Sequence, residues 1–288
     1  MSKKIILVDI DNTLYDWAAF FAPSFRAMVH ALSRELGVPE EQLYAEFKVV
    51  FAKHGSLEYS FSIQELESVR TSETERVRDL IRIGRGAFLH VQKRRLRPYP
   101  GVPETLKWLQ HQNIVVVGIT NSPLHRAQKR LFDLKLDTLL DGIVAWEGFE
   151  PEEDPATFGY VRQSRQRRRT RLARSISIPL SQCKPSEQHY AIALKAFAGN
   201  SSEVWAVGDS LSKDLKPAAK LGLGTIWARY GSGFDPEDRD ASTLLRITHW
   251  NEAEIQRTYS PNGFKPDHTI DSIEELRYII PASVLTLF

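Results

Sequence analysis

Two aspartates, Asp9 and Asp11, lie at the end of an apolar run that starts at residue 5, and Asn-Thr-Leu follows them. Open α/β sheets place ligand sites at the carboxyl ends of their strands, so two carboxylates at such a point suit cation or phosphate chemistry. Acids also end strands and begin turns without any such role. An apolar strand that leads into Asp-x-Asp-Asn-Thr-Leu is much more specific, and it marks this segment as the centre of a candidate site.

Two weaker signals follow later in the chain. Thr120 and Asn121 come directly after the apolar run at residues 114–119. A hydroxyl group and the free backbone amides of a helix start can hold a phosphate oxygen there, although Thr-Asn-Ser-Pro is also an ordinary helix cap. Lys184 precedes another expected helix, and a lone lysine is usually solvated. Neither signal identifies a site by itself.

The segment Gly-Asp-Ser-Leu-Ser-Lys-Asp at residues 208–214 has two acids five positions apart, again at the end of an apolar run. Asp209 is expected at the tip of a strand and Asp214 at the start of the next helix. Both carboxylates could then reach one cation from the same side of the sheet as Asp9. The alternative role of Asp214 is that of an acid stabilised by the helix dipole alone.

The elements that must position these residues alternate between apolar runs and helical patterns. Short apolar runs rich in Val and Ile are typical of strands covered on both faces, as in parallel sheets. They lie at residues 5–10, 114–119, 142–146, 204–207 and 225–228, with an edge strand expected at 268–270. Helical patterns lie at residues 105–112, 124–136, 189–198, 214–221 and 242–258. This alternation predicts an α/β fold with a doubly wound parallel sheet.

The long stretch between the first two strands shows helical patterning and no clear strand. Its expected helices lie at residues 18–36, 39–53, 63–68 and 74–92. We interpret residues 16–97 as an inserted α-helical cap domain, and residues 1–15 with 98–288 as the α/β core. Tyr15 and Trp17 lie at the expected hinge, where they either contact a substrate or only pack the hinge.

A second irregular segment, residues 147–183, is predicted as an insertion inside the core. Its middle part contains seven arginines and no acid between Arg162 and Arg174, so the chain's formal charge of +2 depends on it. Such a run can bind nucleic acid, because phosphate contacts dominate that affinity. No aromatic residue lies within it to stack on bases, so a solvated flap is the favoured interpretation.

Composition excludes several other classes of protein. The chain has 288 residues, of which 42% are hydrophobic and 26% charged, an ordinary globular balance. The single cysteine, Cys183, rules out an intramolecular disulfide. No apolar run approaches the ~20 residues that span a bilayer, and Asp9 interrupts the first run too early for a signal peptide. We expect a soluble, cytoplasmic protein.

In their order along the chain, the four groups resemble the motifs of the haloacid dehalogenase (HAD) superfamily. These motifs are a nucleophile Asp-x-Asp-x-Thr, a Ser or Thr after the second strand, a Lys, and Gly-Asp-x-x-x-x-Asp. All four occur here and span nearly the whole chain. The resemblance implies a HAD-like Rossmann-type core with a helical cap after the first motif. Dehalogenases lack an acid at the position of Asp11, because halide leaves without a proton, so the phosphatase branch is favoured.

The resemblance also implies a role for each catalytic residue. Asp9 would be the nucleophile that becomes an aspartyl-phosphate, a covalent strategy open to carboxylates. Asp11 would protonate the leaving alkoxide and then activate water. Lys184 would neutralise charge on the nucleophile and on the transferring group.

A divalent cation is implied between the like charges of carboxylate and phosphate, and hard oxygen ligands suit Mg²⁺. By resemblance, its ligands would be the carboxylates of Asp9 and Asp209 and the backbone carbonyl of Asp11. Asp214 would support the metal site from behind these ligands or through Lys184. The residues expected to bind phosphate oxygens are Thr120, Asn121 and Lys184.

The resulting prediction is a Mg²⁺-dependent phosphatase that hydrolyses a small phosphomonoester: a nucleotide, a sugar phosphate or a phosphoglycolate-like compound. Nothing in residues 16–97 selects among these. A phosphotransferase or phosphomutase uses the same core and stays open. A nucleic-acid-binding or regulatory protein that uses the segment from Arg162 to Arg174 is a further alternative.

Overall fold

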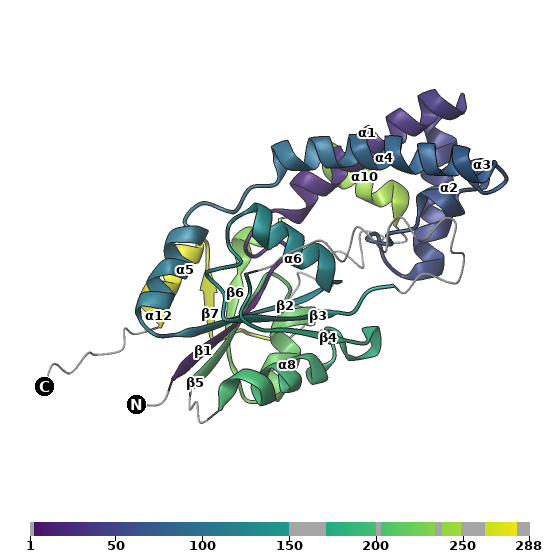
Figure 1. The fold of residues 1–288 in the computed structure, drawn as a ribbon. Coiled ribbons are helices and arrows are strands. Elements are labelled where there is room, and N and C mark those ends of the chain that lie inside the picture. Colours follow the sequence, from purple (N-terminus) through teal and green to yellow (C-terminus); the bar gives the residue numbers. More distant parts are fainter. Residues whose placement is uncertain (1–2, 150–170, 200–202, 234–237, 249–262, 281–288) are drawn as a thin grey trace, which may run out of the picture.

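The computed structural model describes residues 3–149, 171–199, 203–233, 238–248 and 263–280. Within them the strands form a seven-stranded sheet in the order β4-β3-β2-β1-β5-β6-β7, and every pair is parallel (Figure 1). From β1 the chain order proceeds toward β4 on one side and from β5 toward β7 on the other. This is the predicted doubly wound α/β fold. The strands are β1 (Lys4–Asp9), β2 (Val115–Pro123), β3 (Gly142–Trp146), β4 (Ser175–Ile178), β5 (Glu203–Gly208), β6 (Gly224–Ala228) and β7 (His268–Ile270).

All six strands expected from the sequence are present, and β4 is the one that was not expected. It lies inside the irregular segment at residues 147–183 and pairs only with β3, at the edge of the sheet. Its sequence, Ser-Ile-Ser-Ile, alternates polar and apolar residues, and three of its four residues are not fully buried. A search for continuous apolar runs misses such a strand, because an edge strand is covered less completely than a central one.

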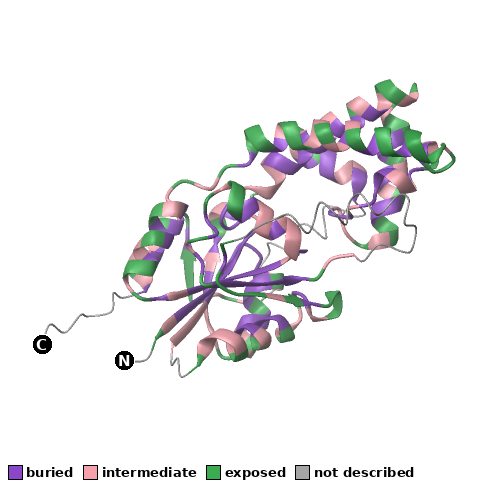
Figure 2. Ribbon diagram, viewed as in Figure 1, coloured by how far each residue is buried: buried purple, intermediate pink, exposed green. Residues whose placement is uncertain are grey.

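The central strands are apolar because helices cover both faces of the sheet. Figure 2 shows that the middle of the sheet is largely buried. Along β1, Ile6 and Val8 belong to one buried cluster and Ile5 and Leu7 to another. The first cluster includes side chains of α5 (Val102–His111) and α6 (Leu124–Asp133). The second includes side chains of α8 (Glu187–Ala193), η4 (Leu211–Leu215) and α9 (Lys216–Lys220). The sheet is therefore the middle of three layers.

The cap is a group of helices beyond the carboxyl ends of the strands (Figure 1). Its longest members, α1 and α4, pack along each other. The Asp16 side chain caps α1 by accepting a hydrogen bond from the Ala19 backbone N–H at 2.9 Å. Gly37 ends the helix with φ of 69°, a left-handed conformation that favours glycine. The cap elements are α1 (Trp17–Leu36), α2 (Glu40–His54), η1 (Ile63–Glu65), α3 (Glu67–Arg70) and α4 (Thr74–Arg95).

One helix from the end of the chain also packs on the cap. This helix, α10 (Arg239–Ile247), lies beneath α1 and contacts both α1 and α2 (Figure 1). The Arg26 guanidinium of α1 pairs with the Asp240 carboxylate at 2.7 Å, and Arg246 stacks over the Tyr44 ring of α2 at 3.6 Å. The predicted partition, which assigned residues 98–288 to the core, therefore omits the contribution of α10 to the cap. The remainder of the helix expected at 242–258 lies outside the described residues.

Only the ends of the predicted 147–183 insertion are described. The arginines from Arg162 to Arg169 lie outside the described residues. The structure therefore does not test most of the segment on which the nucleic-acid hypothesis depends. Arg171 pairs with the buried Asp137 carboxylate at 3.0 Å, and Arg174 lies over the Phe197 ring at 5.1 Å. These two arginines therefore pack onto the core. Among the described residues no helix has the length and apolar character needed to cross a bilayer.

Candidate active site

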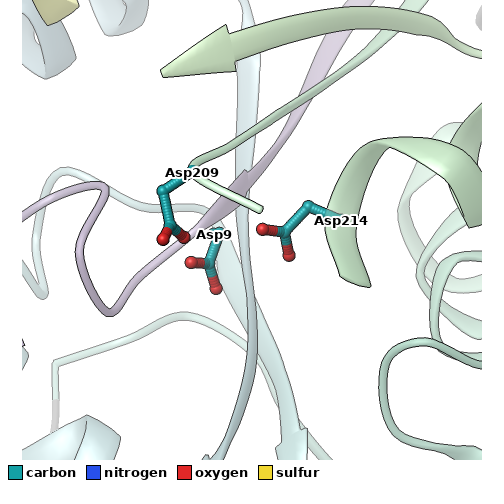
Figure 3. Close-up of side chains that lie close together, drawn as sticks. All are labelled: Asp9, Asp209 and Asp214. Atoms are coloured by element: carbon teal, nitrogen blue, oxygen red, sulfur yellow. The ribbon is translucent and has the colours of Figure 1, made fainter. Parts of the chain in front are cut away.

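The sheet topology brings three aspartates from distant parts of the sequence together (Figure 3). β1 and β5 are neighbours, with Val8 opposite Val207, so Asp9, the last residue of β1, and Asp209, the residue after β5, lie close together. Asp214 comes from η4, which follows β5 directly. One carboxylate oxygen from each aspartate lies within 4.8 Å of the other two, and all three side chains are buried.

Lys184 is the positive charge of this cluster. Its ammonium group contacts Asp9 Oδ1 and lies 2.6 Å from Asp214 Oδ1. Burial opposes the charged form, but the carboxylates of Asp214 and Asp9 prevail and raise the pKa of Lys184 well above its ordinary value. Lys184, which the family resemblance placed beside the nucleophile, is thus buried and held between two carboxylates.

The two oxygens of Asp214 already have protein partners. Oδ1 accepts from Lys184, and Oδ2 accepts from the Ser210 backbone N–H at 2.9 Å. Gly208 permits this approach, because a Cβ at that position would lie only 2.6 Å from the Asp214 side chain. Asp214 is therefore placed to orient Lys184, whereas Asp9 and Asp209 present carboxylates to the same space.

The donor set fits a divalent cation. Three carboxylates and one ammonium group leave two net negative charges in a buried site, and hard carboxylate oxygens are the ligands that Mg²⁺ prefers. Burial raises the pKa of Asp9 to about 7, and burial with the neighbouring Asp214 and Asp9 carboxylates raises the pKa of Asp209 well above its ordinary value. Both pKa values are raised because burial and neighbouring negative charges disfavour the ionised form of each carboxylate.

The Asp11 side chain faces away from this carboxylate cluster. Its Oδ2 accepts from Thr120 Oγ1 at 2.9 Å and from Ser122 Oγ at 2.7 Å. Its Oδ1 accepts from Tyr15 OH at 2.6 Å and from Arg130 Nη1 at 3.0 Å. Four donors hold this carboxylate in one orientation, so it must turn to reach a leaving group. The expected role of its backbone carbonyl as a metal ligand stays a prediction.

The Asn121 side chain clamps the backbone of Lys184. Its Oδ1 accepts from the Lys184 N–H at 3.0 Å, and its Nδ2 donates to the Lys184 carbonyl at 2.6 Å. Thr120 Oγ1 meanwhile accepts from the Ser122 N–H at 3.0 Å while it donates to Asp11. Thr120 and Asn121, two of the three residues expected to bind phosphate, therefore contact the predicted catalytic residues Asp11 and Lys184. Their contact with a phosphate stays a prediction.

Comparison with known proteins agrees with this geometry. The family model for haloacid dehalogenase-like hydrolases matches residues 3–222, and a related HAD-hydrolase-like model matches residues 182–276. The first match covers most of the chain and contains every residue of the site. The chain belongs to the haloacid dehalogenase-like hydrolases.

Individual relatives of this HAD hydrolase are distant. The glyceraldehyde 3-phosphate phosphatase of Methanocaldococcus jannaschii is 23% identical over 96% of each chain. The magnesium-bound HAD-hydrolase YfnB from Bacillus subtilis has a TM-score of 0.52 and 17% identity, covering 97% of this chain and 99% of its own. The 2-haloacid dehalogenase from Pseudomonas syringae pv. Tomato DC3000 has a TM-score of 0.53 and 18% identity, covering 97% and 98%. At this identity the structural likeness shows the fold alone.

Two residues of the HAD hydrolase's site were not anticipated from its sequence, Arg130 of α6 and Glu58 of the cap. Arg130 is 3% exposed and Glu58 is 5% exposed, and the two side chains form an ion pair. Glu58 also accepts from Trp17 Nε1 at 2.9 Å, and the Arg130 guanidinium lies 5.1 Å from the centre of the Phe20 ring. Because Arg130 also bonds Asp11, it joins a cap carboxylate to the predicted catalytic acid.

Electrostatics explain how the buried Glu58 carboxylate stays ionised. Burial alone would favour the neutral acid, but the guanidinium groups of Arg130 and Arg126 lower the pKa of Glu58 to about 2. A signal for Arg130 exists in the sequence, since it shares a helical face with the buried Ala127 and Leu131. Glu58 lies between the helices expected at residues 39–53 and 63–68, in a segment without periodicity, and therefore gives no such signal.

The buried His189, which contacts the backbone of Lys184, should make the stability of the protein depend on pH. The Lys184 N–H donates to His189 Nδ1 at 3.3 Å, and His189 Nε2 donates to the Val144 carbonyl at 3.0 Å. This neutral tautomer is buried, and burial lowers the pKa of His189 to about 3. As pH falls below about 6.5, the unfolded chain binds a proton there that the folded chain does not, so stability is lost.

We expect His189→Gln to remove this pH dependence. Between pH 7.5 and 5.0 the wild-type free energy of unfolding should fall by about 2 kcal/mol relative to the variant, since each pKa unit corresponds to 1.36 kcal/mol. Urea unfolding at both pH values measures the difference. The exposed control His90→Gln should follow the wild type, and equal slopes for all three proteins would contradict the assignment.

Proposed function

We propose that this HAD hydrolase is a Mg²⁺-dependent phosphatase that hydrolyses a small phosphomonoester through an aspartyl-phosphate on Asp9. The observation that carries the proposal is the buried cluster in which Asp9 lies beside Lys184 and Asp209, with a second acid, Asp11, two residues on. A hydrolase that displaces halide has no use for an acid at that position. The presence of Asp11 therefore supports phosphate-ester chemistry.

Each residue has a defined task in the proposed reaction. Asp9 attacks phosphorus, and the bond to the leaving oxygen breaks. Lys184, held between Asp9 and Asp214, stabilises the negative charge on the transferring group. Bound Mg²⁺, held by Asp9 and Asp209, would shield the nucleophile from the charge of the phosphate. Thr120 and the Asn121 backbone amide bind the remaining phosphate oxygens.

Asp11 carries the proton in both steps of the proposal. In the first step Asp11 leaves its four donors, takes a proton from solvent and gives that proton to the leaving alkoxide, which departs as an alcohol. In the second step its carboxylate takes a proton from the water that attacks the aspartyl-phosphate, and inorganic phosphate is released. Tyr15 and Arg130 are two of the donors that this carboxylate must leave before it can act.

The proposed substrate class is a small phosphomonoester. The Methanocaldococcus jannaschii relative, matched over 96% of its length, is a glyceraldehyde 3-phosphate phosphatase, which supports a phosphomonoester. A cap above the catalytic edge supports a substrate small enough to be covered by it, since closure excludes water from the reacting groups.

The test is release of inorganic phosphate from a panel of phosphomonoesters that includes glyceraldehyde 3-phosphate and 4-nitrophenyl phosphate. We expect turnover with Mg²⁺ and none after EDTA, with recovery when Mg²⁺ is restored. Asp11→Asn should slow single-turnover release of the alcohol from alkyl phosphates by roughly 10²–10⁴-fold, and release of 2,4-dinitrophenol from its phosphate much less, because this leaving group needs no acid in the first step. The matched control Asp79→Asn lies exposed on α4. Turnover that resists EDTA, or an equal loss on both leaving groups, would contradict the proposal.

A further inference from the structure

A cavity of about 690 Å³ lies between the cap and α6. Its lining comes from α1, α2, the loop that leads into η1, η1 itself, α4 and α6, and it includes none of the residues Asp9, Thr120, Lys184 and Asp209. The volume falls within the roughly 300–1,000 Å³ typical of small-molecule sites. It is therefore a space of ligand size that none of these four residues lines.

The interior of this cavity is largely apolar and aromatic. Phe21 and Phe25 of α1, Phe51 of α2 and Phe88 of α4 line it together with Met28. Several of these rings pack on one another: Phe21 stacks on Phe25 with centroids 6.0 Å apart and meets Phe88 edge-on at 5.6 Å. A rigid aromatic wall of this kind offers an apolar ligand a large contact area without much loss of side-chain freedom.

The rim of the cavity is strongly basic. Six cationic side chains line it against one carboxylate, that of Asp133, which pairs with Lys129. Arg85 and Lys93 of α4 form no ion pair with any residue that the structure describes, and Arg97 donates only to the backbone carbonyls of Lys93 and Leu96. Arg130 is neutralised by Glu58 and Asp11, so the positive charge left for an anion is that of Arg85, Lys93 and Arg97.

We propose that this cavity binds an organic anion with an apolar body, meaning a carboxylate, sulfonate or phosphate on an aromatic or aliphatic frame. Its apolar part lies among the phenylalanines, and its anionic group meets Arg85 and Lys93. Because cap residues and α6 residues form opposite walls, the occupant holds the cap against the core. Arg130 lines the same cavity and bonds Asp11, so occupancy is coupled to the catalytic acid.

Binding of 8-anilinonaphthalene-1-sulfonate to the full-length protein tests the proposal without any need for turnover. We expect saturable fluorescence enhancement at one site, with affinity reduced by roughly tenfold or more in the double variant Arg85→Ala/Lys93→Ala. The matched double variant Arg82→Ala/Arg94→Ala, exposed on the same helix, should bind like the wild type. Leu89→Trp, which adds bulk to a half-exposed position in the lining, should also weaken binding.

Displacement of the dye identifies the kind of ligand. Laurate and 2-naphthoate test an aliphatic and an aromatic body, and displacement by either one supports the proposal. Inorganic phosphate should fail to displace the dye, because it has no apolar body and its expected site is at Asp9. Displacement by phosphate, or equal dye affinity in the wild type and both cavity variants, would overturn the proposal. Since the readout is binding, it stays interpretable even if the protein hydrolyses no phosphomonoester.

Discussion

Asp9→Asn is expected to abolish phosphate release, with a fall in turnover of at least roughly 10³-fold, the scale seen when a covalent nucleophile is removed. The asparagine amide keeps the size and position of the side chain but has no carboxylate lone pair to form the bond to phosphorus. It also removes one of the two carboxylates proposed to hold Mg²⁺. The measurement is single-turnover and steady-state release of inorganic phosphate at saturating Mg²⁺.

Folding must be shown to survive this substitution, because Asp9 also pairs with buried Lys184. Lys184 keeps a second carboxylate partner, Asp214, at 2.6 Å, so the variant does not leave an isolated buried charge. Burial raises the pKa of Asp9 to about 7, which means that burying this carboxylate is costly and its neutral replacement is tolerated. We therefore expect a folded, inactive protein. A folded variant that keeps more than a tenth of wild-type turnover would remove Asp9 from the mechanism.

The predictable features of this structure are those that the course of the backbone determines without side-chain detail. Asp9 and Asp209 end neighbouring parallel strands, so once the apolar runs are recognised as strands their convergence follows from topology. The doubly wound fold and the helical insertion follow in the same way from the alternation of patterns. No knowledge of side-chain rotamers is needed for these conclusions.

The features that could not be predicted from the sequence depend on side-chain orientation and on contacts between segments far apart in the chain. Asp11 is two residues from Asp9, yet its carboxylate faces Arg130 and Tyr15, because the turn after β1 brings Tyr15 back beside it. The packing of α10 on the cap rests on side-chain pairs separated by more than 200 residues, such as Arg26 with Thr243. Glu58 lies in a segment without periodicity. None of these contacts leaves a local pattern.

Arg130→Met is expected to destabilise the protein by about 3–5 kcal/mol, the usual effect of removing one partner from a buried ion pair. Methionine keeps an unbranched apolar stem but removes the guanidinium that lies over the Phe20 ring. Glu58, which Arg130 keeps ionised with a pKa of about 2, would be left buried without its guanidinium partner. Urea unfolding at pH 7.5 measures the free energy.

The double variant Arg130→Met/Glu58→Gln separates the ion pair from the other contacts of Arg130. A neutral amide at position 58 removes the stranded charge and can still accept from Trp17 Nε1, so it should recover a large part of the lost stability. Asp11 keeps Tyr15, Thr120 and Ser122 as donors in both proteins, so its own site is disturbed equally. Equal stability of the single and double variants would show that Glu58 does not depend on Arg130, and the connection from cap to catalytic acid would lose its energetic basis.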